Sequence, residues 1–495
     1  MVTSNVNVDS SANGTQGQGS ELKSVNSLSK CPRDDGSKMS SEFEYGPDEK
    51  WRILRNVVCI SMAFMIHFTA FVGATNLQSS INAAEGLGTV SLAAVYASLI
   101  LSTIFLPSIL IKRIGCKGAL IASFISYMPY IAAQFYPTYY TVTPTAVLVG
   151  LGGGPFWCAQ CIYLCVVADV YARLTAASTE IIVVRFFGIF YMIYEFGQIF
   201  GNLISSLVLS EDRHNSVANF SILYDVRDIC GANFCPGNED LANPNLERPP
   251  DIKIYTIAGI YLACMLLSVL VLVFGLDSLS RYNEAGLAAK DPPVTGLELL
   301  KTAARLLRRK EQVLLLPLTV WLGLEKAVIA ADYTASFVSC AWGIHNIGYV
   351  MICYGVANSS SAAIGGYIVK LTGRWPVMTS AMLLHIGILI TLLLWRPHPE
   401  DIVIFFLMAG LWGAADGVWN VQINALCGIL APGNEKAAYN LFRLWESVGY
   451  IVAYGQSAAL CTDVKLYIVL GLLLLGMLGY GGIEAGLRSG KKTLP

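Results

Sequence analysis

In the stretch RFFGIFYMIYEFGQ, residues 185 to 198, nine uncharged residues separate an arginine from a glutamate. A second stretch, RLWESVGYIVAYGQ at residues 443 to 456, repeats its arginine, glycine and glutamine at an offset of 258 residues. Long apolar runs that carry isolated charges are typical of membrane-spanning helices. A repeat at this distance indicates two related halves, so these two stretches decide the fold.

The composition of the whole chain predicts a membrane protein. Of its 495 residues, 55% are hydrophobic and 14% are charged, against roughly 25% charged in soluble domains. The net charge is −1 and no basic stripe occurs, so we expect no nucleic-acid partner. No nucleophile and base pair, phosphate-binding loop or metal constellation occurs outside the apolar runs. We therefore expect no enzyme, no metal and no cofactor.

The uncharged runs predict twelve membrane-spanning helices, because about 20 apolar residues cross a bilayer core. The first six lie near residues 54–76, 89–111, 118–136, 145–168, 181–209 and 254–276. The second six lie near residues 313–337, 347–369, 375–395, 402–427, 438–460 and 465–484. The expected fold class is all-α, a polytopic membrane protein with two pseudo-symmetric six-helix bundles.

The distribution of basic residues predicts the orientation. Residues 277–311 carry seven Lys or Arg, whereas the loops at 77–88, 137–144 and 338–346 carry none. The positive-inside rule then places both termini and the central linker in the cytosol. We expect the plasma membrane, with an endomembrane as the alternative. The predicted parts are a disordered tail (1–50), a bundle (51–276) with an outer loop (210–253), the linker (277–311), a second bundle (312–485) and a second tail (486–495).

Two loops carry further signals. The outer loop contains a glycosylation sequon at Asn219 and the cysteines Cys230 and Cys235, which predict at most one disulfide. Residues 295–311 of the linker place apolar residues at helical spacing among basic ones. Such a helix either lies on the anionic inner leaflet or is a solvated linker.

One glycine run is predicted to be structural. GLGGGP at 150–155 has Pro155 where a dinucleotide loop needs its last glycine, and no soluble strand precedes it. Close helix packing is the better interpretation.

Further matches between the halves indicate a known fold. Tyr96, Lys112 and Gly115 recur 258 residues later as Tyr354, Lys370 and Gly373, and Trp157 and Gln160 recur as Trp419 and Gln422. Two such halves with a cytosolic linker resemble the major facilitator superfamily. KRIGCKG (112–118) and GGYIVKLTGR (365–374) lie at that superfamily's inner turns, with Arg113 and Arg374 in the basic positions. The turns usually carry an acid where Lys112 and Lys370 stand, so the usual inner latch is not expected.

Four segments resemble one branch of that superfamily. They are NLQSSIN (76–82), GGGPFWCAQ (152–160), GLEKAVIAADYTASFV (323–338) and GAADGVWNVQINAL (413–426), and they look like the Unc-ninety-three family. The resemblance covers residues 50 to 485. It implies an accessory subunit that regulates two-pore potassium channels, with another membrane protein as its partner. The alternatives are a solute or cation-coupled transporter and a trafficking chaperone for membrane receptors such as Toll-like receptors.

The deep charges leave two interpretations open. Arg185 and Arg443 lie about one turn inside the cytosolic face, where they can reach water, and Glu446 follows Arg443 at i+3. Glu195 lies about 15 Å beyond Arg185, near the midplane. Glu325, Lys326 and Asp416 lie at similar depth, with Asp332 two turns outward from Glu325. We expect these groups to face the cleft between the halves. The four acids form a cation or proton site, or salt bridges such as Lys326 to Asp416 join the halves.

Polar and aromatic residues at repeated positions are further candidates for the cleft. They are Trp157, Gln160, Trp419, Gln422, Asn76 and Gln78. They either offer rings and amides to a ligand or pack one helix on another.

Overall fold

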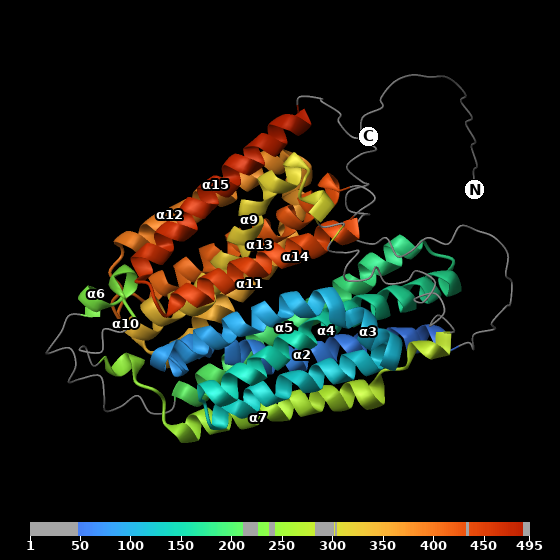
Figure 1. Cartoon of the computed structure of the whole chain (residues 1–495), viewed down its shortest axis with the longest axis horizontal. Helices are drawn as coiled ribbons and strands as arrows, with labels where there is room; N and C mark the ends of the chain where they lie inside the picture. The colour runs from blue at the N-terminus through green and yellow to red at the C-terminus, as the bar shows by residue number, and fades with distance from the viewer. Residues whose placement is uncertain are drawn as a thin grey trace, which may run out of the picture.

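The protein is helical throughout the part of the chain that the computed structural model describes. This part comprises residues 48–210, 226–236, 243–282, 301, 304–431 and 435–488, and it contains no β-strand. Long helices run along the longest axis of the molecule and form two groups that lie side by side (Figure 1). The expected all-α fold class is confirmed. The predicted sequon at Asn219 and most of both tails lie outside the described residues.

The first group, here the N-terminal bundle, contains five long helices among the described residues. They are α2 (Glu49–Ile81), α3 (Leu87–Ala132), α4 (Tyr139–Thr175), α5 (Thr179–Leu209) and α7 (Asp251–Leu270), which the π-helix η8 (Val271–Gly275) continues. Short helices connect them: η2 (Ala84–Gly86), η3 (Ala133–Phe135), α6 (Val226–Ile229), η6 (Gly231–Asn233), η7 (Pro244–Leu246) and η9 (Leu279–Tyr282).

The helix α3 is a hairpin of two arms. In a straight helix, Ser91 and Tyr130 would lie about 58 Å apart at 1.5 Å per residue. Their hydroxyl groups instead form a hydrogen bond of 3.0 Å. The chain reverses at Gly115, whose φ of 71° favours glycine. The two arms correspond to the predicted spans 89–111 and 118–136. The repeat holds here, because Gly373 (φ 84°) separates α11 from α12 in the second group.

The second group, here the C-terminal bundle, contains six long helices. They are α9 (Lys310–Ala327), continued by the π-helix η11 (Val328–Ser339) and α10 (Cys340–Trp342), then α11 (Ile347–Thr372), α12 (Arg374–Leu394), α13 (Ile402–Leu430), α14 (Glu435–Ser457) and α15 (Thr462–Arg488). The short helix η12 (Ile344–Asn346) precedes α11.

Ten stretches of the described residues are long and apolar enough to cross a bilayer. One of them contains both arms of α3. The helix α14 is not among the ten, although it is 23 residues long and packs within the bundle. The chain is therefore a multi-pass membrane protein, and the count of twelve crossings remains a prediction that depends on α14.

Glycines set how closely α4 and α3 pack. A Cβ atom at Gly150 would overlap Ser98 and the backbone of Val95, and one at Gly154 would meet Ser102 Oγ at 2.5 Å. The helices thus approach backbone to backbone, which requires residues without side chains. The packing interpretation of GLGGGP is confirmed.

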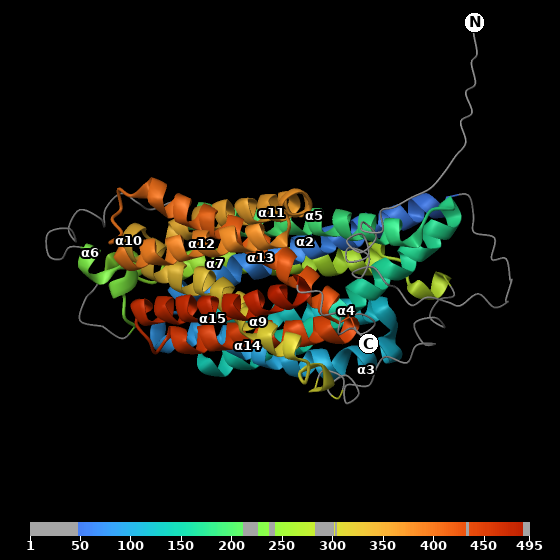
Figure 2. The same cartoon turned by 90° about the horizontal axis from the view of Figure 1, so that it is seen from above.

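The two bundles touch along two pairs of helices. A Cβ atom at Gly348 of α11 would overlap the carbonyl of Asn202 on α5. On the other pair, the rings of Tyr96 on α3 and Tyr450 on α14 stack with centroids 4.0 Å apart. Figure 2 shows these two pairs at opposite edges of the molecule. Between them, Ser79 of α2 meets Thr334 of η11 at 3.5 Å.

The cysteine prediction is wrong. Two disulfides form, Cys230–Cys340 and Cys235–Cys461, so Cys230 and Cys235 do not pair with each other. Both bonds join the loop between α5 and α7 to the C-terminal bundle. The available signal was that Cys340 and Cys461 also fall in short predicted outer segments, between spans. We call this end of the molecule, at the left of Figure 1, the disulfide end, and the opposite end the linker end.

Candidate functional site

A chain of polar contacts runs through the middle of the C-terminal bundle. Lys326 of α9 donates from Nζ to Asn420 Oδ1 of α13 at 2.5 Å and to Glu446 Oε1 of α14 at 3.1 Å. The second carboxylate oxygen of Glu446 accepts from Arg443 Nη1 at 2.7 Å. Only 16% of the Lys326 side chain and 5% of the Glu446 side chain are exposed.

Two glycines bring α9 and α14 close enough for this contact. A Cβ atom at Gly323 would overlap the carbonyl of Glu446, and one at Gly449 would overlap the carbonyl of Val320. Because neither position carries a side chain, the two helix backbones touch. Glu446 therefore reaches Lys326, which lies one turn along α9 from Gly323.

Asp416 continues the same chain and accepts hydrogen bonds from three side chains. Its Oδ1 accepts from Asn420 Nδ2 at 2.8 Å, and its Oδ2 accepts from Tyr354 Oη and Asn358 Nδ2, each at 2.6 Å. Glu325 of α9 interacts electrostatically with Asp416. Neither acid is exposed at all.

Glu325 has one partnered and one unpartnered oxygen. The indole Nε1 of Trp412 donates to its Oε2. Its Oε1 is buried and has no hydrogen-bond partner among the described residues. The Trp412 ring also packs against His385, whose two ring nitrogens are likewise buried and without partners there.

A second buried ion pair lies nearer the disulfide end. Asp332 of η11 accepts from Lys465 Nζ at 2.8 Å and from Ser457 Oγ at 2.6 Å. The sequence prediction missed Lys465, because it stands at the first residue of a predicted span, where a lysine usually reaches water. In the structure 1% of its side chain is exposed.

Exposed side chains of both bundles lie close to this chain of contacts. Glu195 of α5 is exposed, makes no hydrogen bond within the described residues, and interacts electrostatically with Asp416 and Lys326. Tyr191, one turn away, is 42% exposed and interacts with Arg443 of α14, whose side chain is 62% exposed. We call the space between Glu195, Tyr191 and Arg443 the interbundle cleft.

The structure separates the four predicted cleft acids. Glu195 faces the cleft, whereas Glu325, Asp332 and Asp416 lie inside the C-terminal bundle. Asp416 shares its helix face with Gly413 and Gly417, where a Cβ atom would overlap α11. That face therefore packs on α11 and does not line the cleft. The glycines on either side of Asp416 are the sequence signal that could have predicted this packing.

The suggested ion pair between Lys326 and Asp416 is not the one that forms. Lys326 pairs with Glu446, and Asn420 bridges Lys326 to Asp416. All four residues belong to the C-terminal bundle. These contacts therefore stabilise one bundle and do not join the two halves.

The other cleft candidates lie mostly within the bundles. Gln160 and Trp419 are fully buried, and Gln422 is nearly so. Trp157 packs against the rings of Phe64, Phe68 and Tyr194, and Trp419 packs against Trp321. Asn76 donates to Asn202 at 3.0 Å, and Gln78 accepts from Asn82 at 2.8 Å. These contacts favour the helix-packing interpretation, and a role in ligand binding remains a prediction.

The basic residues of the linker end show no latch. Lys112, Arg113 and Arg185 are exposed, and no ion pair joins them or Arg374 to an acid within the described residues. The side chain of Lys370 lies outside the described part. Nearby, Leu306 of the predicted linker helix is buried against Ala431, Ala438 and Leu441 of the C-terminal bundle. The apolar side of that helix thus partly contacts protein, and its binding to anionic lipid remains a prediction.

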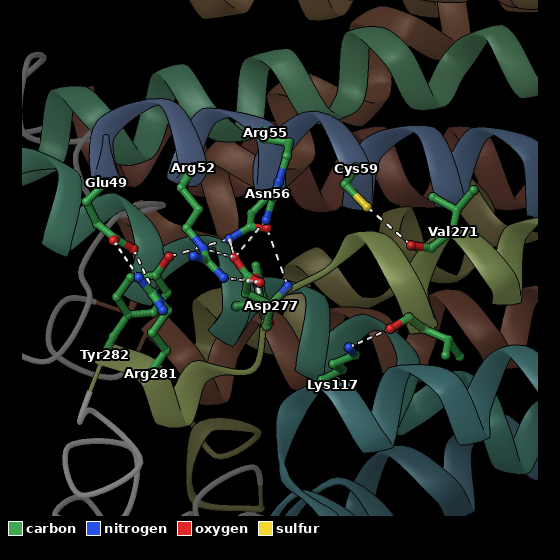
Figure 3. Close-up of polar contacts among 12 residues, drawn as sticks. Glu49, Arg52, Arg55, Asn56, Cys59, Lys117, Val271, Asp277, Arg281 and Tyr282 are labelled. Atoms are coloured by element: carbon green, nitrogen blue, oxygen red, sulfur yellow. Dashed lines mark hydrogen bonds and ion pairs between the residues drawn. The ribbon is translucent and has the colours of Figure 1, made fainter. Parts of the chain in front are cut away.

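A polar cluster that the sequence did not reveal closes the linker end of the N-terminal bundle (Figure 3). Arg52 of α2 donates two hydrogen bonds to the Asp277 carboxylate, at 2.6 and 3.0 Å. Arg55 donates a third at 2.9 Å. Arg281 forms a similar pair of bonds to Glu49. In the sequence, charged residues at the ends of membrane spans look like ordinary solvent-exposed loop residues. Here they tie the end of the sixth span to the start of the first.

Comparison with known proteins identifies relatives over most of the chain. Residues 78–480 match the family described as "Ion channel regulatory protein UNC-93". "Protein unc-93 homolog A" of Xenopus laevis is 39% identical over 431 residues, which cover 87% of this chain and 93% of that protein. "Putative potassium channel regulatory protein unc-93" of Caenorhabditis elegans is 33% identical over 448 residues, covering 90% of this chain and 63% of that protein.

Solved structures identify the fold. The crystal structure of the nucleoside transporter NupG superimposes with a TM-score of 0.58 at 14% identity, covering 86% of this chain and 98% of that one. At this identity the likeness shows the fold alone. The major facilitator fold expected from the repeated halves is confirmed.

Proposed function

Because the chain belongs to the UNC-93 family of ion channel regulatory proteins, we propose that it acts as an accessory membrane subunit that regulates a potassium channel. One observation carries the proposal: the match to the family extends through both bundles, from residue 78 to residue 480. The Caenorhabditis elegans relative, which is named for potassium channel regulation, supports the choice of ion. An enzymatic activity forms no part of this proposal.

The use of the deep charges supports a regulator. A cation-coupled carrier needs an ionisable group that is free to exchange its ion with the cleft. Lys326, Glu446 and Asp332 are instead held in buried ion pairs within one bundle. In a regulatory subunit, buried ion pairs of this kind are needed only to stabilise the fold.

We propose that the disulfide end faces the outside of the cell or the lumen. Disulfides form in oxidising compartments, and both bonds lie at this end. The linker end, where α2 begins and α15 ends, then lies in the cytosol, as the positive-inside rule predicts. The plasma membrane is the proposed location, and Asn219, in the same loop as Cys230, is then open to glycosylation.

Co-expression with a two-pore potassium channel tests the regulatory role. We expect the protein to change the current or the surface density of the channel, measured by voltage clamp and surface biotinylation in the same cells. An unrelated transporter with the same fold, expressed at the same level, is the control. If neither quantity changes relative to that control for any two-pore channel tested, the proposal is wrong.

Glu195 favours a second candidate, a cation-coupled carrier. It is an ionisable group that is exposed and has no hydrogen-bond partner in the described residues. A flux assay on the purified protein in liposomes separates the two functions. Uptake that is abolished by E195Q would establish the carrier. Affinity capture of partners in the same cells tests the third candidate, a trafficking chaperone, by recovering a receptor in place of a channel.

A further inference from the structure

We propose that Glu325 and Asp416 hold one proton between them and form a buried proton-binding site inside the C-terminal bundle. Both residues are completely buried and interact electrostatically, and Trp412, one turn from Asp416 on α13, donates to Glu325 of α9. Two carboxylates that lie close together in a water-free interior repel each other strongly. One proton between them removes the repulsion and creates a hydrogen bond.

The hydrogen bonds around the pair leave one place for that proton. Asp416 accepts from Tyr354, Asn358 and Asn420, so both of its oxygens are already acceptors. Glu325 Oε2 accepts from Trp412, whereas Oε1 has no partner within the described residues. A proton on Oε1 that is donated to Asp416 satisfies the one buried oxygen of the pair that lacks a partner.

The charges around the pair call for one proton. Lys326 and Arg443 are positive, and Glu446, Asp416 and Glu325 are negative when ionised. The five groups then sum to one negative charge, and all of them except Arg443 are buried or mostly buried. One added proton makes the network neutral, which is the state that burial favours.

Other titratable groups near the pair do not supply this balance. Tyr354 donates its hydroxyl to Asp416 and is neutral. His385 packs on Trp412 with no partner for either nitrogen among the described residues, which favours the neutral ring. Glu195, from the other bundle, is exposed to solvent in the cleft. The pair Asp332 and Lys465 is neutral by itself.

The surrounding donors select a proton over a metal ion. A metal cation needs several oxygen lone pairs directed at it. The groups that surround the two acids instead direct N–H and O–H bonds inward, from Trp412, Asn358, Asn420 and Tyr354. Within the described residues, no group of three or more His, Cys, Asp or Glu residues is placed to hold a metal ion.

The site connects to the interbundle cleft through hydrogen bonds. Asn420 donates to Asp416 and accepts from Lys326, Lys326 bonds to Glu446, and Glu446 bonds to the exposed Arg443. A change of protonation at the buried end therefore changes the charge balance of a network whose other end lines the cleft. This inference does not rest on the regulation of a channel.

Infrared spectroscopy of the purified protein in liposomes tests the proposal. At neutral pH we expect the carbonyl band of a buried protonated carboxylic acid. E325Q removes the band, and D416N removes or shifts it. A matched control, D332N, leaves the band unchanged, since this acid is paired with Lys465. Absence of the band from the wild-type protein, or its survival in both E325Q and D416N, would overturn the proposal.

Folding of the variants gives a second readout. The amide of E325Q has the shape of the protonated acid and donates to Asp416 in the same way. We therefore expect E325Q to melt at the temperature of the wild type, and E325A to melt lower because it leaves a cavity. An E325Q protein that fails to fold also contradicts the shared proton. The infrared and melting measurements both use the isolated protein, so their outcome does not depend on the result of the channel assay.

Discussion

At the scale of single residues, Lys326 is the junction of the charged chain in the C-terminal bundle. It contacts α13 through Asn420 and α14 through Glu446, and it is mostly buried. Removing one member of a buried ion pair leaves the other charge without compensation. Arg443 alone then remains for Glu446, from a side chain that is largely exposed.

We predict that K326M lowers the free energy of unfolding by about 3 kcal/mol, because it leaves the Glu446 carboxylate buried with one weaker partner. The double variant K326M/E446Q removes both charges and should recover most of that loss. Thermal unfolding of the purified proteins in detergent measures both. A double variant that is less stable than K326M would show that the ion pair does not hold these helices.

Glu195 should behave in the opposite way. It is exposed and has no hydrogen-bond partner in the described residues, so E195Q should change the free energy of unfolding by no more than about 0.5 kcal/mol. Its effect should appear only in function. A large loss of thermal stability in E195Q would mean that the carboxylate is engaged in the fold and does not stand free in the cleft.

At the scale of elements, glycines decide which helices touch. The helices α9 and α14 meet at Gly323 and Gly449, and this contact places Glu446 beside Lys326. The same helix offers a matched control, because a Cβ atom at Gly455 would meet nothing within 4 Å.

We predict that G449A destabilises the protein by about 1–3 kcal/mol, since its Cβ atom would overlap the carbonyl of Val320 and force α14 away from α9. G455A should be neutral or stabilising by up to about 1 kcal/mol, because alanine favours a helix over glycine. Melting temperatures of the two variants provide the comparison. Equal values would contradict the close approach of the two backbones.

At the scale of the whole molecule, two disulfides join the two halves of the chain at one end. The loop between α5 and α7 is held on the C-terminal bundle by these bonds, and by Asn243, which donates to the carbonyl of Cys340 at 2.9 Å. Thr462 adds a backbone hydrogen bond to Phe234 at 2.9 Å. The loop therefore belongs by sequence to one bundle and by contact to the other.

A protease site introduced into the central linker tests this arrangement. After cleavage, the two halves should run as one band on a non-reducing gel and as two bands after reduction. The variant C340S/C461S should give two bands under both conditions. Two bands from the cleaved wild-type protein without reductant would contradict both disulfides between the halves.

The helical class, the positions of most spans, the repeated halves and the family could be predicted from the sequence alone. These features depend on local properties: the length of apolar runs, the spacing of residues along one helix, and glycines such as Gly115 and Gly373 that fix a turn. Such signals need no knowledge of which helices become neighbours. The sequence also identified the acids of the candidate site, since a charge in an apolar run is conspicuous wherever the helix lies.

The partners of those residues could be found only in the folded protein. Cys230 and Cys340 are separated by 110 residues, and Lys326 and Glu446 by 120, so no local pattern links them. Which acids face the cleft depended on the face of each helix that packs, and for Asp416 that face was set by Gly413 and Gly417 against α11. Pairing over such distances arises because helix packing brings remote turns to the same depth and excludes water, and this happens only when the bundle is assembled.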